Sequence, residues 1–132
     1  MKLEVWNDTL ELFSIVFRML SKLEKVDFKL QGQILDAAQS ISANIAEGYC
    51  RRTINEYLYF LNVGLGSLGE LMTRVTGLNL IEKIFQDDFH SFDELHYKVE
   101  NKLLALIKSL QEKQKVGTWE MELKEPSEPY QS

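Results

Sequence analysis

Three polar residues share one face of a predicted helix in the segment 33–51. Ser40, Asn44 and Glu47 are four and three residues apart, the spacing that stacks side chains on one side of a helix. A hydroxyl, an amide and a carboxylate on one face could bind a ligand or orient a reacting group. They could also form a hydrogen-bond network that fixes how two helices pack, because buried polar groups must be paired.

A second polar row follows at helical spacing, at Glu56, Ser67, Glu70 and Arg74. We favour the structural interpretation of both rows, since no catalytic partner accompanies them and polar groups that specify packing are well attested. The predicted structural network comprises Gln33, Ser40, Asn44, Glu47, Glu56, Ser67 and Glu70.

Metal-dependent or thiol chemistry lacks its usual residues. A carboxylate metal centre in a helical bundle needs inward glutamates on every helix and Glu-x-x-His on two of them. The only histidines, His90 and His96, each follow an aspartate by three residues, but no matching pair exists. We expect both to be surface or staple residues. Cys50 lies beside two arginines with no histidine base, which indicates an inert thiol. The sequence therefore predicts no metal, no cofactor and no enzymatic activity.

Basic residues are the candidates for contacts with nucleic-acid phosphates. We select Arg51, Arg52, Arg74, Lys98 and Lys102. Symmetry in an oligomer would multiply even a modest basic patch. The alternative is a solvated helix face on which glutamates alternate with lysines, and it stays open.

Hydrophobic periodicity predicts four helices, over about 5–25, 31–49, 53 to 80–84, and 91–115. Capping-box spacing marks the start of the third at Thr53 and of the fourth at Ser91. The pattern predicts an all-α protein, an antiparallel up-down-up-down four-helix bundle over 1–116. Residues 117–132 hold both prolines and four glutamates, which predicts a short, disordered, acidic C-terminal tail in which Trp119 and Tyr130 could still dock on a neighbour.

Two features of the helices favour close packing and self-association. The first helix carries two apolar rows where a bundle needs one wide stripe: Trp6, Leu10, Phe13, Phe17 and Leu20, and then Leu12, Val16, Met19 and Leu23. The third helix contains four interior glycines, a pattern that predicts close backbone approach. The excess of apolar surface predicts a homo-oligomer.

Composition restricts the class of protein. The chain has 132 residues, a net charge of −5 and one cysteine, which fits one domain in a reducing compartment. No apolar run approaches the roughly 20 residues of a membrane span. We expect a cytoplasmic protein with no membrane role. The region 1–116 has a net charge of only −2, so its charge does not by itself indicate nucleic-acid binding.

The segment from Gln33 to Arg51 also carries a family resemblance. With Glu56, Phe60-Leu61 and Gly66-Ser67-Leu68-Gly69-Glu70-Leu71 it resembles the four-helix-bundle proteins encoded by intervening sequences of bacterial large-subunit ribosomal RNA genes. The block Asn44-Ile45-Ala46-Glu47-Gly48 is the specific part. The likeness covers most of residues 3–111.

The resemblance implies a ring-shaped homo-oligomer, commonly a pentamer, with a non-enzymatic role in association with RNA or a nucleic-acid-processing partner. The chain departs from the family pattern at Leu35-Asp36, where members usually have a basic pair, at Ser42, usually proline, and at Met72, usually glutamate. The missing basic pair weakens the RNA hypothesis. The alternative hypothesis is an oligomeric protein-binding scaffold with no nucleic-acid role.

Overall fold

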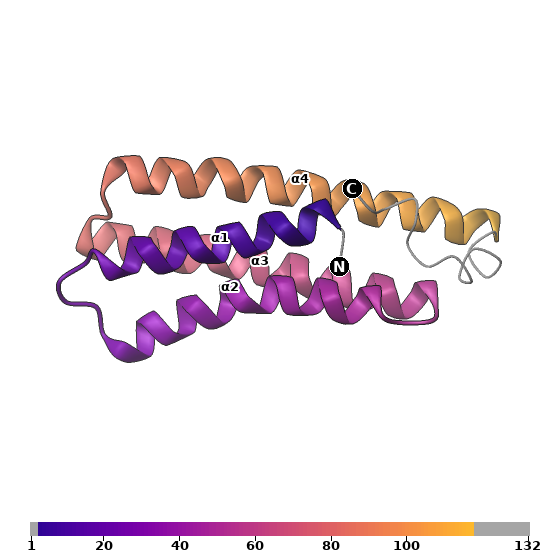
Figure 1. Ribbon diagram of the computed structural model, residues 1–132, viewed down its shortest axis with the longest axis horizontal. Helices are drawn as coiled ribbons and strands as arrows, with labels where there is room; N and C mark the ends of the chain where they lie inside the picture. The colour runs from indigo at the N-terminus through magenta and orange to yellow at the C-terminus, as the bar shows by residue number, and fades with distance from the viewer. Residues whose placement is uncertain (1–2, 118–132) are drawn as a thin grey trace.

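The computed structural model describes residues 3–117 as four helices, each antiparallel to the next and joined by short connections (Figure 1). They are α1 (Glu4–Ser21), α2 (Phe28–Tyr49), α3 (Ile54–Glu82) and α4 (Gln86–Val116). No strand occurs within the described part of the chain. The predicted all-α up-down bundle is confirmed. Of the predicted tail, 117–132, only Gly117 lies among the described residues, so Trp119 and Tyr130 lie outside them.

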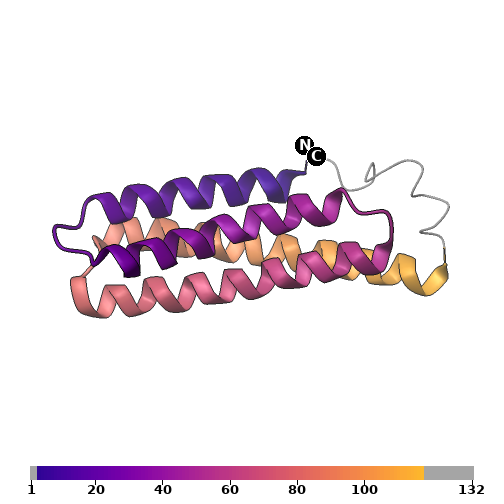
Figure 2. The same cartoon turned by 90° about the horizontal axis from the view of Figure 1, so that it is seen from below.

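Each helix packs against the helices before and after it, and α4 closes the bundle by packing on α1 (Figure 2). Apolar side chains of all four helices fill the interior. On α2, an apolar stripe at helical spacing is buried: Ile34, Ala38, Ile41 and Ile45. The corresponding buried stripe of α4 is Phe92, Leu95, Val99, Leu103, Leu106 and Leu110.

The two apolar rows of α1 have different surroundings. Leu12, Val16 and Met19 of the second row are at most 1% exposed and belong to the core. In the first row, by contrast, Leu10 and Phe17 remain 41% and 53% exposed. An isolated bundle therefore leaves part of this row in contact with water.

The helix boundaries differ from the prediction at three places. The first helix ends earlier than predicted, at Ser21. The second helix, α2, begins earlier than predicted, at Phe28. Asp27 caps its start, because its side chain accepts a bond of 3.2 Å from the Leu30 amide. The prediction that the fourth helix begins at Ser91 was wrong, because α4 begins at Gln86. Two acidic residues in its first turn favour that earlier start, since the N-terminal end of a helix dipole attracts negative charge. The Thr53 cap of α3 is confirmed, with its hydroxyl accepting from the Glu56 amide at 3.2 Å.

Three of the four interior glycines of α3 do not behave as predicted. A Cβ added at Gly66, Gly69 or Gly77 would have no neighbour within 4 Å, so no close approach requires glycine there. Gly64 is buried against α2, where a Cβ would lie 3.6 Å from the Ile41 carbonyl oxygen, an ordinary contact distance.

The tighter approach lies in α2. A Cβ at Gly48 would lie 2.9 Å from Tyr57 Cδ1 and 3.1 Å from the Tyr57 carbonyl oxygen. Glycine at 48 therefore lets the ends of α2 and α3 meet at their connection.

Within residues 3–117, no helix has the length and apolar character needed to cross a membrane.

Candidate nucleic-acid interface and the polar contacts beside it

The polar row of α2 faces α3 across the middle of the bundle. The hydroxyl oxygens of Ser40 and Ser67 lie 2.8 Å apart. The Asn44 amide donates to the Ser40 hydroxyl at 3.0 Å and to the Ser40 carbonyl oxygen at 2.7 Å. Ser67 is buried, so these bonds satisfy polar groups that would otherwise lose water without replacement. The three residues thus hold two helices of one chain together.

A second polar contact joins the same two helices closer to the start of α2. The Arg74 guanidinium donates to Gln33 Oε1 at 3.0 Å and to Glu70 Oε2 at 2.9 Å. Arg74, selected from the sequence as a phosphate contact, therefore has a carboxylate partner on its own helix and an amide partner on α2. Its charge is largely neutralised by Glu70.

Glu47 and Glu56, the other two residues of the predicted network, lie near the connection between α2 and α3. Glu47 forms an ion pair with Arg51 one turn further along the chain. Glu56 accepts a bond of 3.1 Å from the Thr53 hydroxyl at the start of α3. Both are separate from the Ser40–Ser67 contact and have different partners, so the seven residues belong to four local contacts and not to one network.

Arginines and aromatic rings gather at that connection. The Arg51 guanidinium carbon lies 4.9 Å from the centroid of the Phe60 ring, a cation–π distance. The Tyr59 and Phe60 rings meet edge to face with centroids 5.1 Å apart. Arg51, Asn55, Glu56, Tyr59 and Phe60 line an open hollow of about 390 Å³. Arg52 is exposed beside Arg51.

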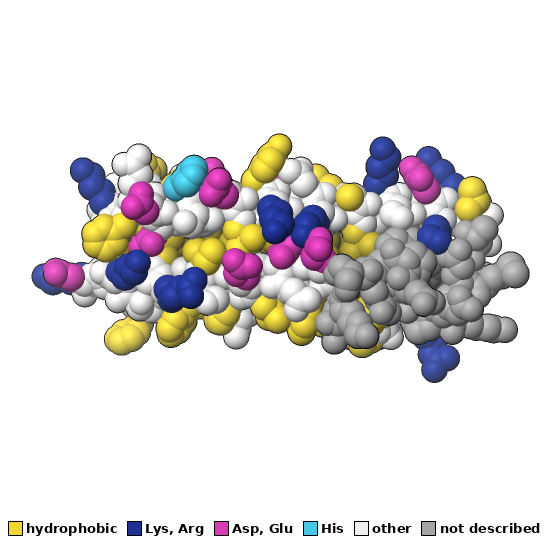
Figure 3. Space-filling view, turned by 45° about the horizontal axis from the view of Figure 1, so that its top comes forward, with side chains coloured by type: hydrophobic (Ala, Val, Ile, Leu, Met, Phe, Trp, Pro, Cys, Tyr) yellow, Lys and Arg dark blue, Asp and Glu magenta, His cyan; other side chains and the backbone are white. Residues whose placement is uncertain are grey.

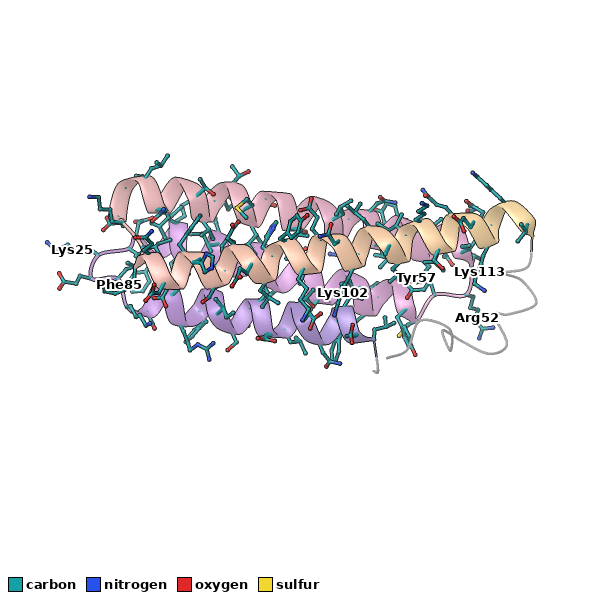
Figure 4. The ribbon with its side chains drawn as sticks, turned by 90° about the horizontal axis from the view of Figure 1, so that it is seen from above. Lys25, Arg52, Tyr57, Phe85, Lys102 and Lys113 are labelled. Carbon is teal, nitrogen blue, oxygen red and sulfur yellow. The ribbon has the colours of Figure 1, made fainter. Side chains whose placement is uncertain are left out.

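The end of α4 lies next to this connection. The Gln114 amide donates to the Asn55 side chain of α3, which fixes the last turns of α4 against the start of α3. Figure 4 shows Arg52 and Lys113 at the same end of the bundle, with Lys25 and Phe85 at the opposite end. We call this part of the molecule, residues 47–60 and 107–117, the turn end. Its basic residues are Arg51, Arg52, Lys108, Lys113 and Lys115, and its acidic residues are Glu47, Glu56 and Glu112.

Lys102 is a component of a charged contact between α4 and α1. Its ammonium nitrogen lies 2.7 Å from Asp8 Oδ2 and 2.5 Å from Glu4 Oε1. Partial burial lowers the pKa of Lys102, but its hydrogen bonds to Asp8 and Glu4 outweigh that effect and raise the pKa above its usual value. The same hydrogen bond and the charge of Lys102 lower the pKa of Glu4. Lys102 lies near the middle of the bundle in Figure 4, away from Arg52.

The five basic residues selected from the sequence therefore occupy three places. Arg51 and Arg52 lie at the turn end, and Arg74 lies between α2 and α3. Lys98 and Lys102 lie on α4, and the positive charge of Lys98 also helps to lower the pKa of Glu4. Eleven residues separate Lys102 from Lys113, about 16 Å along a helix. The structure brings only the arginine pair of this set together with other basic residues.

The histidines lie in different surroundings. His90 is exposed, with Nε2 3.5 Å from a Glu94 carboxylate oxygen. Of the two expected positions for His96, the surface one is excluded. His96 is 6% exposed, and its Nε2 lies 2.7 Å from the Leu68 carbonyl oxygen. Because a carbonyl oxygen only accepts, Nε2 of His96 must carry the proton. Cys50 is exposed at the end of α2, and no group of three histidine, cysteine, aspartate or glutamate residues within 3–117 converges as metal ligands would.

The family model described as 23S rRNA-intervening sequence protein matches residues 1–105. The chain belongs to this family. The resemblance seen in the sequence is thereby confirmed. A crystal structure from Bacteroides thetaiotaomicron, of a protein of unknown function from the S23 ribosomal protein family, is similar with a TM-score of 0.71 and 24% identity over 79% of this chain and 98% of that chain. At that identity the likeness shows the fold alone. No curated protein matches the sequence.

In this intervening-sequence family member, the structure shows what residues 44–48, the specific part of the resemblance, contact. Asn44 bonds to Ser40, Ile45 is buried, and Gly48 allows the close approach to Tyr57. The contacts that sequence reasoning missed join distant residues. Asp8 lies 94 residues from Lys102, and the one available signal was an acidic residue within the apolar stripe of α1.

Proposed function

We propose that this intervening-sequence family protein is a non-enzymatic, self-associating helical protein that associates with RNA, or with a nucleic-acid-processing partner, through the turn end. The observation that carries the RNA proposal is that Arg51, Tyr59 and Phe60 line one open hollow, with the exposed Arg52 next to Arg51 in the chain.

Arginine beside exposed aromatic rings suits single-stranded RNA. Proteins recognise unpaired bases by stacking them on aromatic side chains and on guanidinium planes. Tyr59 is 62% exposed, which leaves much of this residue accessible to a base. Arg51 is already held over Phe60 and paired with Glu47, whereas Arg52 has no hydrogen bond or ion pair to another described residue and is the stronger candidate for a phosphate.

The charge of the turn end favours the same function. Its five basic and three acidic residues give a net charge of +2, whereas the whole chain has −5. Phosphate contacts from lysine and arginine supply most of the non-specific affinity for nucleic acids. Leu35 and Asp36, which replace the family's usual basic pair, lie on α2 well before this connection, so their replacement removes no charge from the turn end.

The non-enzymatic part of the proposal follows from the partners of the candidate catalytic groups. Ser40 and Asn44 bond within the α2–α3 contact, and His96 bonds to a backbone carbonyl group. A serine or histidine that acts on a substrate would have to give up a contact that holds the bundle together.

We expect self-association to give a closed ring of five copies. Such a ring would repeat the turn end around its symmetry axis. Each copy contributes its own arginines, so a weak contact of one chain becomes a multivalent one. The mass of the assembly in solution tests the number of copies.

A titration of labelled RNA with unpaired loops into the full chain at low salt tests the RNA proposal. We expect binding that weakens steeply as salt increases, because counterions are released from the phosphates. Fully paired RNA of equal length is the control and should bind less tightly. Absence of binding at tens of micromolar protein would overturn the RNA proposal.

The alternative, an oligomeric protein-binding scaffold, is favoured by the opposite end of the bundle. Leu80, Ile81 and Phe85 are 82%, 74% and 60% exposed there. Exposed apolar side chains of this size mark protein contacts when they cluster. Two results together would support the scaffold instead. The full chain would not bind RNA, and it would bind a protein partner that the double variant Leu80→Ser, Ile81→Ser no longer binds.

A further inference from the structure

We propose that the C-terminal segment 118–132 of this chain docks on the turn end and competes there with RNA. The inference concerns the regulation of the RNA site and rests on the proposed function. The segment itself lies outside the described residues. The described surface beside its point of attachment is open, basic and aromatic, and these three properties match the sequence of the segment.

Three of the four described helices extend to the turn end. Glu4 and Asp8, in the first two turns of α1, contact Lys102 of α4. Beyond that contact α4 continues for fourteen residues, 103–116, about 21 Å. Figure 1 shows the start of α1 part-way along α4, while the α2–α3 connection and the end of α4 extend farther. Within the described residues, the place that α1 takes in the rest of the bundle is therefore not filled by a helix at the turn end.

The side of α4 that faces α1 continues along this open place. Lys113 follows Lys102 by eleven residues, which is three helical turns and about 20°, so both lie on the same side of α4. Leu106, one turn after Lys102, lies near that side and is buried. Carboxylates of α1 contact Lys102, but Lys113 lies about 16 Å farther along the helix. A segment with carboxylates and apolar side chains would continue here the contacts that α1 makes with the earlier part of α4.

The segment and the turn end carry opposite charges. The turn end has a net charge of +2. On the face shown in Figure 3, lysine and arginine side chains predominate over acidic ones at the end where α4 extends beyond α1. The segment has one basic residue, Lys124, and a net charge of −3. Its four acidic residues are Glu120, Glu122, Glu125 and Glu128. Attraction between opposite charges therefore favours the turn end as the place where the segment docks.

The segment offers the same two chemical groups that RNA offers to this site. Its carboxylates can take the place of phosphates at Arg52, which is exposed. Its two aromatic side chains, Trp119 and Tyr130, can take the place of bases against Tyr59, since aromatic rings also pack on one another. Because the same residues of the turn end would contact either partner, the docked segment and RNA exclude one another.

The point of attachment lets the segment reach this surface. Gly117 ends α4 in the left-handed conformation, with φ of 70°, so the helix does not continue past it. The Gln114 side chain bonds to Asn55, which places this end of α4 beside the start of α3. The fifteen residues of the segment span up to about 50 Å when extended. That length is more than twice the roughly 21 Å of α4 beyond Lys102.

The covalent link makes even a weak contact sufficient. A short flexible tether gives an effective concentration on the order of 1 mM, so a contact with an intrinsic Kd on the order of 0.1 mM would form in about nine of ten molecules. A site that is free in only about one tenth of the molecules binds its ligand about tenfold more weakly. Weakening the docked contact should therefore raise the affinity for RNA.

The RNA affinity of full-length variants tests the competition. The segment variant combines Glu120→Gln, Glu122→Gln, Glu125→Gln and Glu128→Gln. The matched control neutralises four exposed acidic residues outside the turn end: Glu11→Gln, Glu24→Gln, Asp36→Asn and Glu82→Gln. Both variants change the net charge from −5 to −1, because each loses four negative charges.

We expect the segment variant to bind RNA with unpaired loops about ten times more tightly than the wild type. At about 0.1 M salt, charges more than about 10 Å away are largely screened, so the control should differ from the wild type by less than about twofold. Equal gains in affinity for the two variants would overturn the competition, since the effect would then come from net charge alone.

A second measurement, made without RNA, tests the docking itself. Cys50 is the only cysteine of the chain and is exposed at the turn end. In Met121→Cys, exchange with oxidised glutathione should form a disulfide between positions 50 and 121 of one chain. Adding the four glutamine substitutions of the segment should slow this step severalfold, although the tether is unchanged. Equal rates with and without these substitutions, or disulfides only between copies, would overturn the docking.

The outcomes separate this inference from the proposed function. Suppose that the segment variant and the control bind RNA equally well, and that the glutamine substitutions leave disulfide formation unchanged. The inference is then removed, and the RNA role stays. If no protein binds RNA but the glutamine substitutions slow disulfide formation, the segment docks and the RNA role is removed. Tighter RNA binding by the segment variant alone, with unchanged disulfide formation, would show that the glutamates only repel RNA, which overturns the docking.

Discussion

Ser40 in α2 and Ser67 in α3 place their hydroxyl oxygens 2.8 Å apart, although 27 residues separate them in the sequence. Asn44 donates to the Ser40 hydroxyl from the next turn of α2. The polar row that looked able to do chemistry is therefore a contact between two helices. It sits beside the glycine that lets those helices meet, so residues 40–48 act as one packing unit.

We predict that Ser67→Ala lowers the free energy of unfolding by about 1 kcal/mol, because it removes one neutral hydrogen bond in a buried position. Ser40→Ala should cost more, about 1–2 kcal/mol, since it removes the partner of both Ser67 and Asn44. Urea unfolding of the two single variants and the double variant measures the coupling. The double variant should lose less than the sum of the two, and strict additivity would show that the hydroxyls do not interact.

The two kinds of glycine should respond in opposite directions to alanine. Gly48→Ala places a Cβ 2.9 Å from Tyr57 Cδ1 and 3.1 Å from a carbonyl oxygen, so we expect a loss of about 1–3 kcal/mol. Gly69→Ala meets nothing within 4 Å and should stabilise α3 by about 0.4–1 kcal/mol, through the helix propensity of alanine and the lower entropy of the unfolded chain. Thermal unfolding compares them, and a stabilised Gly48→Ala would contradict the close approach.

The contact of Lys102 with Glu4 and Asp8 predicts that the free energy of unfolding falls at both acidic and alkaline pH. The pKa of Glu4 is lowered from 4.5, so its contribution is present above pH 4.5 and disappears as the pH falls through the lowered pKa of the folded state. The pKa of Lys102 is raised from 10.5, so its contribution is present below pH 10.5 and disappears as the pH rises through the raised pKa. Between these limits Lys102→Met should cost about 1–3 kcal/mol, because it leaves the buried Asp8 carboxylate unpaired.

Denaturant unfolding of the wild type and Lys102→Met as a function of pH checks this profile. The difference between the two proteins should be largest between pH 4.5 and 10.5 and should shrink on both sides. Lys98→Met, one turn away on α4, is the control and should change stability by less than about 0.5 kcal/mol. A difference that does not depend on pH would show that Lys102 acts through packing alone.

The sequence predicts the helices better than it predicts their contacts. Apolar spacing identifies the buried stripes of α2 and α4 because burial on one side of a helix repeats every 3.6 residues. The same reasoning placed the start of α4 five residues late, since Ser91 and Glu94 have capping spacing in a segment that is already helical. It could not say which apolar row of α1 faces the core, because both rows satisfy the same period.

Hydrophobic periodicity does not predict which residues from distant parts of the sequence contact each other. The spacing put Ser40 and Asn44 on one face of α2, but Ser67 could be identified as their partner only once α3 was in place. Lys102 looks like a free basic residue in the sequence, yet it pairs with Asp8 of α1 in the fold. The four-residue spacing of Glu70 and Arg74 allows for their ion pair, but the bond from Arg74 to Gln33 of α2 depends on the fold. Arg51 and Arg52 were selected from the sequence, whereas the contact of Arg51 with Phe60 and the position of Arg52 at the same end of the bundle as Lys113 follow from the fold.

The central claim is that RNA binds at the turn end, and the salt dependence of binding tests it most directly. The variant is Arg52→Gln, and the control is Lys25→Gln, which removes one positive charge from the opposite end of the bundle (Figure 4). For Arg52→Gln, the slope of log K against log salt should fall by about one, whereas Lys25→Gln should leave it unchanged. Tyr59→Ala should weaken binding by about tenfold through lost base stacking. Equal slopes for wild type, Arg52→Gln and Lys25→Gln, with tight binding retained, would contradict the account.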